Sequence, residues 1–258
     1  MITTDIIRSK KGKEKIIALT AYDYTFAKLL DQAGADIILV GDSVGMVCHG
    51  DNNTQSVTMD QMVYHTEGVA KGVANALVVG DMPVNSYDEP EIAVRNARRL
   101  IAAGAQAVKI EEVQNVVPAV KAIIKEGIDV VGHVGLTPQT AQNFKVKGKD
   151  KEEAEKIIAD AQAFEQAGVF AIVLECIPTE LAKHITEVAS VPTIGIGAGP
   201  CCDGQILVTY DLLGMFQDFR PKFVRHFMEG GSAVKEALSE FRRAVESGNF
   251  PQDKESFK

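Results

Sequence analysis

The chain has 258 residues, 46% hydrophobic and 24% charged, which is typical of a globular protein that needs no disulfide or metal to hold its core. Its formal net charge of −8 argues against a general nucleic-acid binder, which would need a positive surface. The longest apolar runs, such as 37–40 and 76–79, are far shorter than the roughly 20 residues that span a bilayer. The first fifteen residues show no apolar core of a secretory signal, so we expect a cytoplasmic protein without membrane or nucleic-acid partners.

Short apolar runs alternate with helical patterns along the chain. The runs are rich in Val, Ile and Leu and four or five residues long, as expected of strands buried on both faces. A glycine closes several helical stretches where a left-handed residue ends a helix, as at Gly34, Gly104 and Gly168. The predicted strands begin at Ile16, Ile37, Ala76, Ala107, Ile128, Ala171, Thr193 and Ile206. The predicted helices cover about 24–33, 58–74, 89–103, 117–126, 151–167, 179–189 and 232–247.

This alternation predicts a parallel sheet with right-handed crossovers. Eight strands in about 200 residues favour a (β/α)8 TIM barrel. A doubly wound open sheet is the main alternative, but no GxGxxG turn follows the first strand. No composition break divides the chain, so we expect one barrel domain over residues 1–258, with a short N-terminal extension and a C-terminal helix and tail.

Acidic residues follow four of the predicted strands: Asp42, Asp81, Glu111 (with Glu112 beside it) and Glu175. In a barrel these positions share the C-terminal rim, where barrel enzymes place their active sites. Each acid alone is explained as well by a helix cap or a solvated loop. Converging carboxylates repel one another unless a cation or proton lies between them, and oxygen ligands suit Mg²⁺. The spacing therefore predicts a magnesium site.

Three other residues fall near the same rim. Lys109, two residues before Glu111, offers a positive charge for a carboxylate or an enolate oxygen. Ser43 offers a hydroxyl after Asp42, and His133, after the fifth strand, faces either the pocket or the barrel core. Neither an HExxH nor a CxxC motif occurs, so a zinc hydrolase is not expected. The residues indicate a metal-assisted enzyme acting on a small anion.

An ordered set of motifs extends this interpretation. LTAYDYTFAKLLDQAGADIILVGDSVGMV, YHTEGVAKG, GDMP, AVKIE, GHVGLTPQ, VLECIP, IPTELAKHIT, IGIGAG and CDGQILV follow one another from about Thr20 to Phe250. Together they resemble the ketopantoate hydroxymethyltransferase family. One departure is a shorter loop after LTPQ, where Asn143–Phe144 leads directly into Lys145–Val146.

The resemblance implies a barrel of the phosphoenolpyruvate/pyruvate superfamily, assembled as a cytoplasmic homodecamer. It implies transfer of a one-carbon unit from 5,10-methylenetetrahydrofolate to 3-methyl-2-oxobutanoate, giving 2-dehydropantoate. By motif, Asp42, Asp81 and Glu111 correspond to Mg²⁺ ligands or close neighbours, and Glu175 to the general base. The residues expected at the oxo acid are Asp42, Ser43, Asp81, Lys109 and His133, the last without a defined role.

Two other functions remain open on the sequence alone. One is a magnesium-dependent C–C lyase or phosphonomutase of the same barrel superfamily, which would use a similar enolate site. Cys48 lies in GMVCHGD, outside any lyase-like cysteine loop. The other is a barrel that only binds a metabolite, which would leave the set of acids and Lys109 unexplained.

Overall fold

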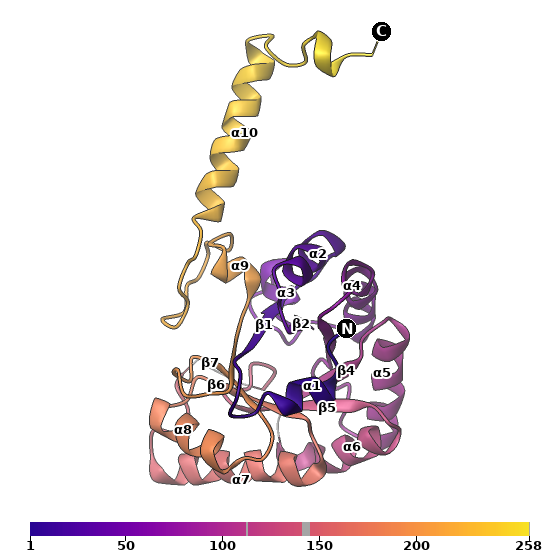
Figure 1. Cartoon of the computed structure of the whole chain (residues 1–258), viewed down its shortest axis with the longest axis vertical. Coiled ribbons are helices and arrows are strands. Elements are labelled where there is room, and N and C mark those ends of the chain that lie inside the picture. Colours follow the sequence, from indigo (N-terminus) through magenta and orange to yellow (C-terminus); the bar gives the residue numbers. More distant parts are fainter. Residues whose placement is uncertain (112, 141–144, 258) are drawn as a thin grey trace. The chain divides into compact units, whose positions relative to one another are not determined.

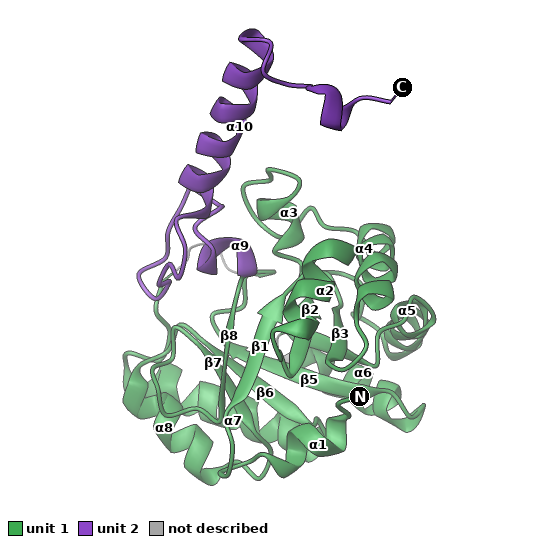
Figure 2. Ribbon diagram, turned by 45° about the horizontal axis from the view of Figure 1, so that its top comes forward, with its two compact units in different colours: residues 1–208 green, residues 209–258 purple. Residues whose placement is uncertain are grey.

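The computed structural model describes residues 1–111, 113–140 and 145–257. These form two compact units, residues 1–208 and 209–258 (Figure 2). Glu112 and the shortened loop at 141–144 lie outside the described residues. Within the described ranges, no helix is both long enough and apolar enough to cross a bilayer.

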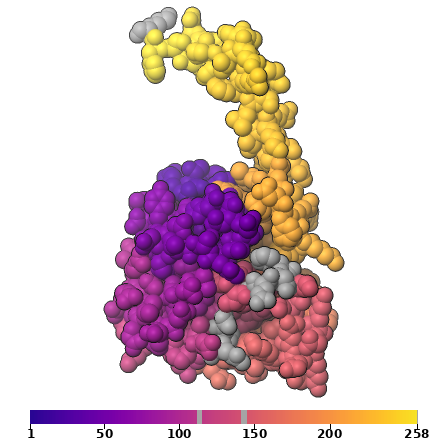
Figure 3. All heavy atoms as spheres, turned by 180° about the vertical axis from the view of Figure 1, so that it is seen from behind, coloured from indigo at the N-terminus to yellow at the C-terminus, as the bar shows by residue number. Residues whose placement is uncertain are grey.

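The first unit is a closed barrel of eight parallel strands in sequence order, so the barrel prediction is confirmed and the open sheet is wrong. Each strand pairs with the next, and β8 closes the ring by pairing with β1. In the space-filling view, successive segments of this unit follow one another round its surface (Figure 3). The strands are β1 Ile16–Thr20, β2 Ile37–Val40, β3 Leu77–Asp81, β4 Ala107–Glu111, β5 Asp129–Gly135, β6 Ala171–Glu175, β7 Thr193–Ile196 and β8 Gly204–Leu207.

Helices cover the outside of this ring of strands (Figure 1). N-cap side chains accept a hydrogen bond from a backbone N–H of the first turn in four of them: Thr3, Asp23, Thr58 and Asp150. The helices of the barrel unit are α1 Thr4–Ser9, α2 Tyr24–Gln32, α3 Val44–Val47, α4 Met59–Gly72, α5 Pro90–Ala102, α6 Val113–Lys125, α7 Lys151–Ala167 and α8 Thr179–Val188.

The predicted element boundaries need a few corrections. Strands β3 and β5 begin one residue later than predicted, and β8 begins two residues earlier, at Gly204. Helix α6 begins at Val113 rather than at 117, and the patterns did not predict the short helices α1 and α3. The glycine caps at Gly34, Gly104 and Gly168 do adopt positive φ, as expected.

Alternate residues of the strands fill the inside of the barrel. One buried cluster contains residues from all eight strands, and four of the strands contribute two residues spaced two apart, such as Leu77 and Val79 of β3. Ile7 of α1 belongs to the same cluster and is fully buried. Because side chains alternate between the two faces of a strand, the next inward position of β3 is Asp81. The alternation that points apolar side chains into the core therefore also points the polar side chain at the carboxyl end of the strand inward.

The second unit contains α9 Thr209–Leu212, α10 Gly230–Glu246 and a short 3₁₀ helix, η1 Asp253–Glu255. The prediction at 232–247 corresponds to α10, whereas α9 and η1 were not predicted. Helix α10 carries large apolar side chains at helical spacing, and each is about half exposed: Val234, Leu238, Phe241 and Val245.

Candidate active site

The carboxyl ends of β3 to β6 bring the predicted polar residues together through strand register. Asp81 of β3 is directly opposite Lys109 of β4, and Glu111 of β4 is opposite His133 of β5. Glu175 ends β6 opposite Gly135. The sequence pattern placed His133 after the fifth strand, whereas the structure places it within β5. Asp42 lies two residues beyond the end of β2.

Lys109 is the central cation of this group. Its Nζ lies 2.8 Å from both carboxylate oxygens of Asp81 and 3.2 Å from Oε1 of Glu111. All three side chains are almost completely buried. Burial lowers the pKa of Lys109, but the carboxylates of Asp81 and Glu111 outweigh burial and hold it well above its usual range. Lys109 therefore stays charged at neutral pH.

His133 connects the buried acid Glu111 to the less buried acid Glu175. Its Nδ1 is 2.9 Å from Oε1 of Glu111. Its Nε2 is 3.2 Å from Oε2 of Glu175, within ion-pair distance but poorly aligned for a hydrogen bond. Burial lowers the pKa of His133. The acids Glu111 and Glu175 outweigh burial, so the pKa rises to about 9. The imidazole is thus a second buried cation.

The acids respond differently to their neighbours. Burial raises the pKa of Glu111, but Lys109 and His133 lower it to about 2. Asp42 lies farther from these cations, and burial together with Asp81 raises its pKa well above the usual range. Burial also raises the pKa of Asp81, and Lys109 only partly offsets this. The negative charge is therefore least compensated where Asp42 meets Asp81, whose Oδ2 accepts the backbone N–H of Asp42 at 3.2 Å.

Ser43 lies beside Asp42 as the N-cap residue of α3. Its hydroxyl makes no capping hydrogen bond and lies 2.8 Å from the hydroxyl of Tyr22, which is buried. The sequence indicated a hydroxyl after Asp42, and the structure places it at the start of a short helix. Tyr22, which follows β1, thus holds the Ser43 hydroxyl at the carboxyl ends of the strands, which we call the mouth of the barrel.

Gln139 belongs to the same group and was missed by the sequence analysis. It lies in the loop after β5 and is 2% exposed. Its backbone N–H donates to Glu111 and its side-chain amide donates to Asp42. Tyr87, also buried and also missed, donates its hydroxyl to the carbonyl end of that amide. No sequence motif marks this pair, because the contacts join segments 28 to 97 residues apart.

The backbone around Glu175 is tightly constrained. Cys176 follows it with a φ of 49°, a left-handed conformation that only a few per cent of residues other than glycine adopt. Gly135 has a φ of 98°, and a Cβ atom there would lie 2.3 Å from the carbonyl oxygen of Glu175. The backbone at Glu175 is thus held by close packing against β5.

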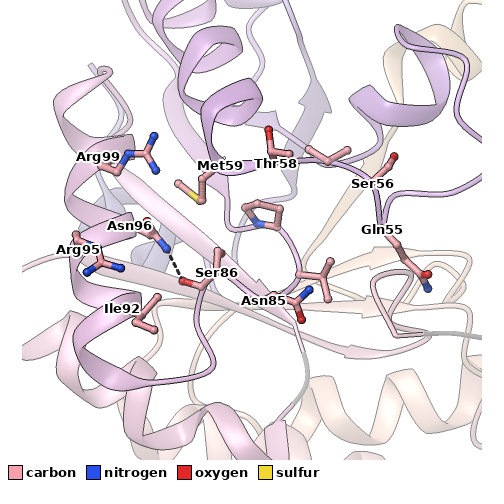
Figure 4. Close-up of a pocket in the computed structure, with 13 residues that line it drawn as sticks. Gln55, Ser56, Thr58, Met59, Asn85, Ser86, Ile92, Arg95, Asn96 and Arg99 are labelled. Carbon is pink, nitrogen blue, oxygen red and sulfur yellow. Dashed lines mark hydrogen bonds between the residues drawn. The ribbon is translucent and has the colours of Figure 1, made fainter.

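A separate hollow of about 460 Å³ lies between the loop that leads into α4, the loop after β3 and helix α5 (Figure 4). Helix α5 lines it with Arg95, Asn96 and Arg99, and Asn96 donates to the carbonyl of Ser86 at 2.8 Å. None of the seven residues predicted for the site lines this hollow.

A closed parallel barrel with buried charged groups at the carboxyl ends of its strands defines the chain as a (β/α)8-barrel protein with an enzyme-like mouth. The chain belongs to the ketopantoate hydroxymethyltransferase family, whose model matches residues 1–253. It is therefore an enzyme of the hydroxymethyltransferase kind.

Curated relatives agree with this assignment. A 3-methyl-2-oxobutanoate hydroxymethyltransferase of Syntrophomonas wolfei is 53% identical over 99% of this chain and 95% of that protein. The protein of the same name from Caldicellulosiruptor saccharolyticus is 52% identical over 99% of both chains.

Solved structures share the fold at lower identity. A putative phosphonomutase from Burkholderia cenocepacia has a TM-score of 0.68 at 15% identity, covering 92% of this chain and 99% of the other. A phosphonopyruvate hydrolase solved with oxalate and Mg²⁺ has a TM-score of 0.64 at 15% identity, covering 99% and 93%. These likenesses support the barrel alone, so the lyase or mutase alternative fits less well than the transferase.

Proposed function

We propose that this protein transfers a hydroxymethyl group from 5,10-methylenetetrahydrofolate to 3-methyl-2-oxobutanoate, giving 2-dehydropantoate and tetrahydrofolate. The observation that carries the proposal is the continuous buried network from Asp42 through Asp81, Lys109, Glu111 and His133 to Glu175. It combines an excess of carboxylates, two fixed cations and one half-buried carboxylate at a barrel mouth.

The donor set at the mouth fits Mg²⁺. The acids are oxygen donors, and four carboxyl groups face two cations, which leaves a formal charge of −2 if all are ionised. Burial, and after it the carboxylate of Asp81, raises the pKa of Asp42, and a bound cation would relieve the repulsion between these two acids. Among the described residues, no three His, Cys, Asp or Glu side chains converge closely enough to hold an ion by themselves. We therefore assign Asp42 and Asp81 as direct ligands and Glu111 as a ligand through water, leaving the other positions to water and substrate.

The protein residues then divide the work at the 2-oxo acid. Bound Mg²⁺ supplies Lewis-acid polarisation of the substrate carbonyl, which makes the hydrogen on C3 more acidic. Lys109 holds a positive charge beside the developing oxygen charge, and Ser43 supplies a hydroxyl fixed by Tyr22. Glu175 takes the C3 proton, and His133 keeps the carboxylate of Glu175 directed toward the mouth.

Carbon–carbon bond formation follows proton removal. The electron pair left on C3 attacks the methylene carbon of the folate, and the bonds from that carbon to the folate nitrogens break. One water molecule supplies the new hydroxyl group and one proton, and the C3 proton taken by Glu175 supplies the other, so that both folate nitrogens leave as N–H groups. The folate thus leaves as tetrahydrofolate without a change in the oxidation state of the protein.

A direct assay tests the proposal. Purified protein with 3-methyl-2-oxobutanoate, 5,10-methylenetetrahydrofolate and Mg²⁺ is expected to form 2-dehydropantoate, and EDTA is expected to stop the reaction. Asp81→Ala is expected to lose metal-dependent binding of the oxo acid in calorimetry. Unchanged affinity in that variant would count against the ligand assignment, and absence of product from the wild type would reject the function.

We further propose that residues 209–258 serve the same enzyme by joining copies of the chain into a cytoplasmic homodecamer. The apolar face of α10 supports association, since surfaces of this kind usually contact another protein. Light scattering after size exclusion is expected to give ten copies of the 27.8-kDa chain, about 280 kDa. Leu238→Glu is expected to lower this mass, and a monomeric wild type would reject the assembly.

A further inference from the structure

Gln139 makes four hydrogen bonds at the site, three through its buried side chain and one through its backbone N–H. Its Nε2 donates to Oδ2 of Asp42 at 2.9 Å and to the carbonyl of Met82 at 3.0 Å. Its Oε1 accepts from the hydroxyl of Tyr87, and its backbone N–H donates to Oε2 of Glu111 at 3.1 Å. One residue of the loop after β5 therefore reaches the carboxyl ends of β2, β3 and β4.

The partners fix which end of the amide faces which way. The carbonyl of Met82 only accepts hydrogen bonds, so the NH₂ end must face it. Burial and the carboxylate of Glu111 raise the pKa of Tyr87, which keeps its hydroxyl protonated and able to donate. The hydroxyl therefore takes the carbonyl end of the amide, and the NH₂ end also points at Asp42.

Gln139 links two acids that strand pairing does not place side by side, Asp42 through its side-chain amide and Glu111 through its backbone N–H. Asp42 follows β2 and Glu111 ends β4, with β3 between them. Within the described part of the chain, Gln139 is the only side chain that donates a hydrogen bond to the carboxylate of Asp42. The direction of that carboxylate thus depends on Gln139.

We propose that Gln139 is a positioning residue whose side-chain amide, oriented by Tyr87, holds the carboxylate of Asp42 in the arrangement that accepts the metal and the oxo acid. Its backbone N–H holds the carboxylate of Glu111 at the same time. The inference rests on the proposed function, because it takes these acids as the metal-binding end of the site. Residues that orient metal ligands typically change metal affinity by 10- to 100-fold when they are removed.

The test measures metal binding apart from turnover. Calorimetry with Mg²⁺ in the presence of 3-methyl-2-oxobutanoate is expected to show at least tenfold weaker binding in Gln139→Ala than in the wild type. Raising Mg²⁺ is expected to restore much of the kcat of the variant, because a displaced ligand lowers affinity more than it removes chemistry. Damage to the fold would not be rescued by metal.

Two further variants keep the test decisive if Gln139→Ala is unstable. Tyr87→Phe removes only the orienting hydroxyl and is expected to weaken binding three- to tenfold. The double variant is expected to bind no more weakly than Gln139→Ala, because both changes act through one amide. Gln106→Ala is the matched control, since this glutamine accepts from the N–H of Val78 at the opposite end of β3 and β4, and its Mg²⁺ affinity is expected to match the wild type.

The outcomes separate the two proposals. Failure of the wild type to bind Mg²⁺ and oxo acid together would reject the proposed function, and this inference with it. If the wild type binds both while Gln139→Ala and Tyr87→Phe bind with wild-type affinity, the positioning role is wrong and the function stands. Additive losses in the double variant would also overturn the role assigned to Tyr87.

Discussion

Buried aspartates at the two ends of the barrel differ in how their negative charge is compensated. At the amino-terminal end, Asp31 accepts backbone N–H groups of Ala74, Asn75 and Ala76, just before β3. Asp203, just before β8, accepts N–H groups of Gly12 and Thr193 and pairs with Lys11. Backbone and lysine donors therefore compensate each carboxylate at this end.

At the carboxyl end, carboxylates face one another instead. Hydrogen bonds outweigh burial and lower the pKa of Asp31 and Asp203, whereas burial raises the pKa of Asp42 and Asp81. An acid with enough donors stabilises the fold, while an acid left with excess charge is available to a ligand. The comparison therefore assigns structural work to one end of the barrel and chemistry to the other.

The largest expected effect tests the chemical end. Glu175→Gln removes the base without changing side-chain size, so kcat and exchange of the C3 proton are expected to fall by about 10²- to 10⁴-fold. Proton NMR of 3-methyl-2-oxobutanoate in D₂O measures the exchange in the absence of folate. The variant is expected to bind the oxo acid and to unfold at the wild-type denaturant concentration. Exchange at the wild-type rate would reject Glu175 as the base.

The next effect tests the structural end. Asp203→Asn removes the charge that Lys11 and two backbone N–H groups satisfy, and we expect a loss of about 2 kcal/mol in the free energy of unfolding. Urea unfolding followed by circular dichroism measures this loss. Activity at 25 °C is expected to stay near the wild-type value. A variant that loses activity while keeping its stability would contradict the division between the two ends.

The pH dependence of stability sharpens the same contrast. Burial alone would raise the pKa of Asp203. The hydrogen bonds from Lys11 and the backbone N–H groups outweigh burial, so the pKa lies below the usual value of 3.8. The unfolded state therefore binds this proton more tightly, and the stabilisation present above about pH 4 is lost as pH falls through the lower folded pKa. Urea midpoints between pH 2.5 and 6 are expected to fall less steeply in Asp203→Asn. If the urea midpoints of the two proteins fall in parallel with pH, Asp203 contributes nothing to the loss of stability in acid.

Much of the barrel follows from local patterns. Glycine at a helix end and a short apolar run after it fix where a strand begins, and both signals lie within ten residues of each other. Helix α6 departs from expectation because Pro118, a residue typical of a first helical turn, lies well inside it. Short helices such as α1 and α3 are too brief to show a periodic pattern.

The candidate site is predictable only in part, for a related reason. Asp81, Glu111 and Glu175 each end a strand, so position alone places them at one rim. Gln139 and Tyr87 lie four and six residues beyond the ends of β5 and β3, and their contacts depend on how two loops meet in space. A sequence pattern records what neighbours along the chain share, whereas these contacts exist only after the barrel has closed.

The smallest expected effect separates the contribution of Lys11 from that of the backbone donors to Asp203. Lys11 donates to the carboxylate of Asp203 at 2.8 Å and to the carbonyl of Thr186 at 2.6 Å, but its side chain is 21% exposed. Water reaches such a pair, so Lys11→Ala is expected to cost about 1 kcal/mol, less than Asp203→Asn, because the backbone donors to Asp203 remain. Combining the two changes is expected to cost less than their sum, since both remove the same ion pair. Additive costs, measured by urea unfolding, would show that Lys11 acts through Thr186 rather than through the aspartate.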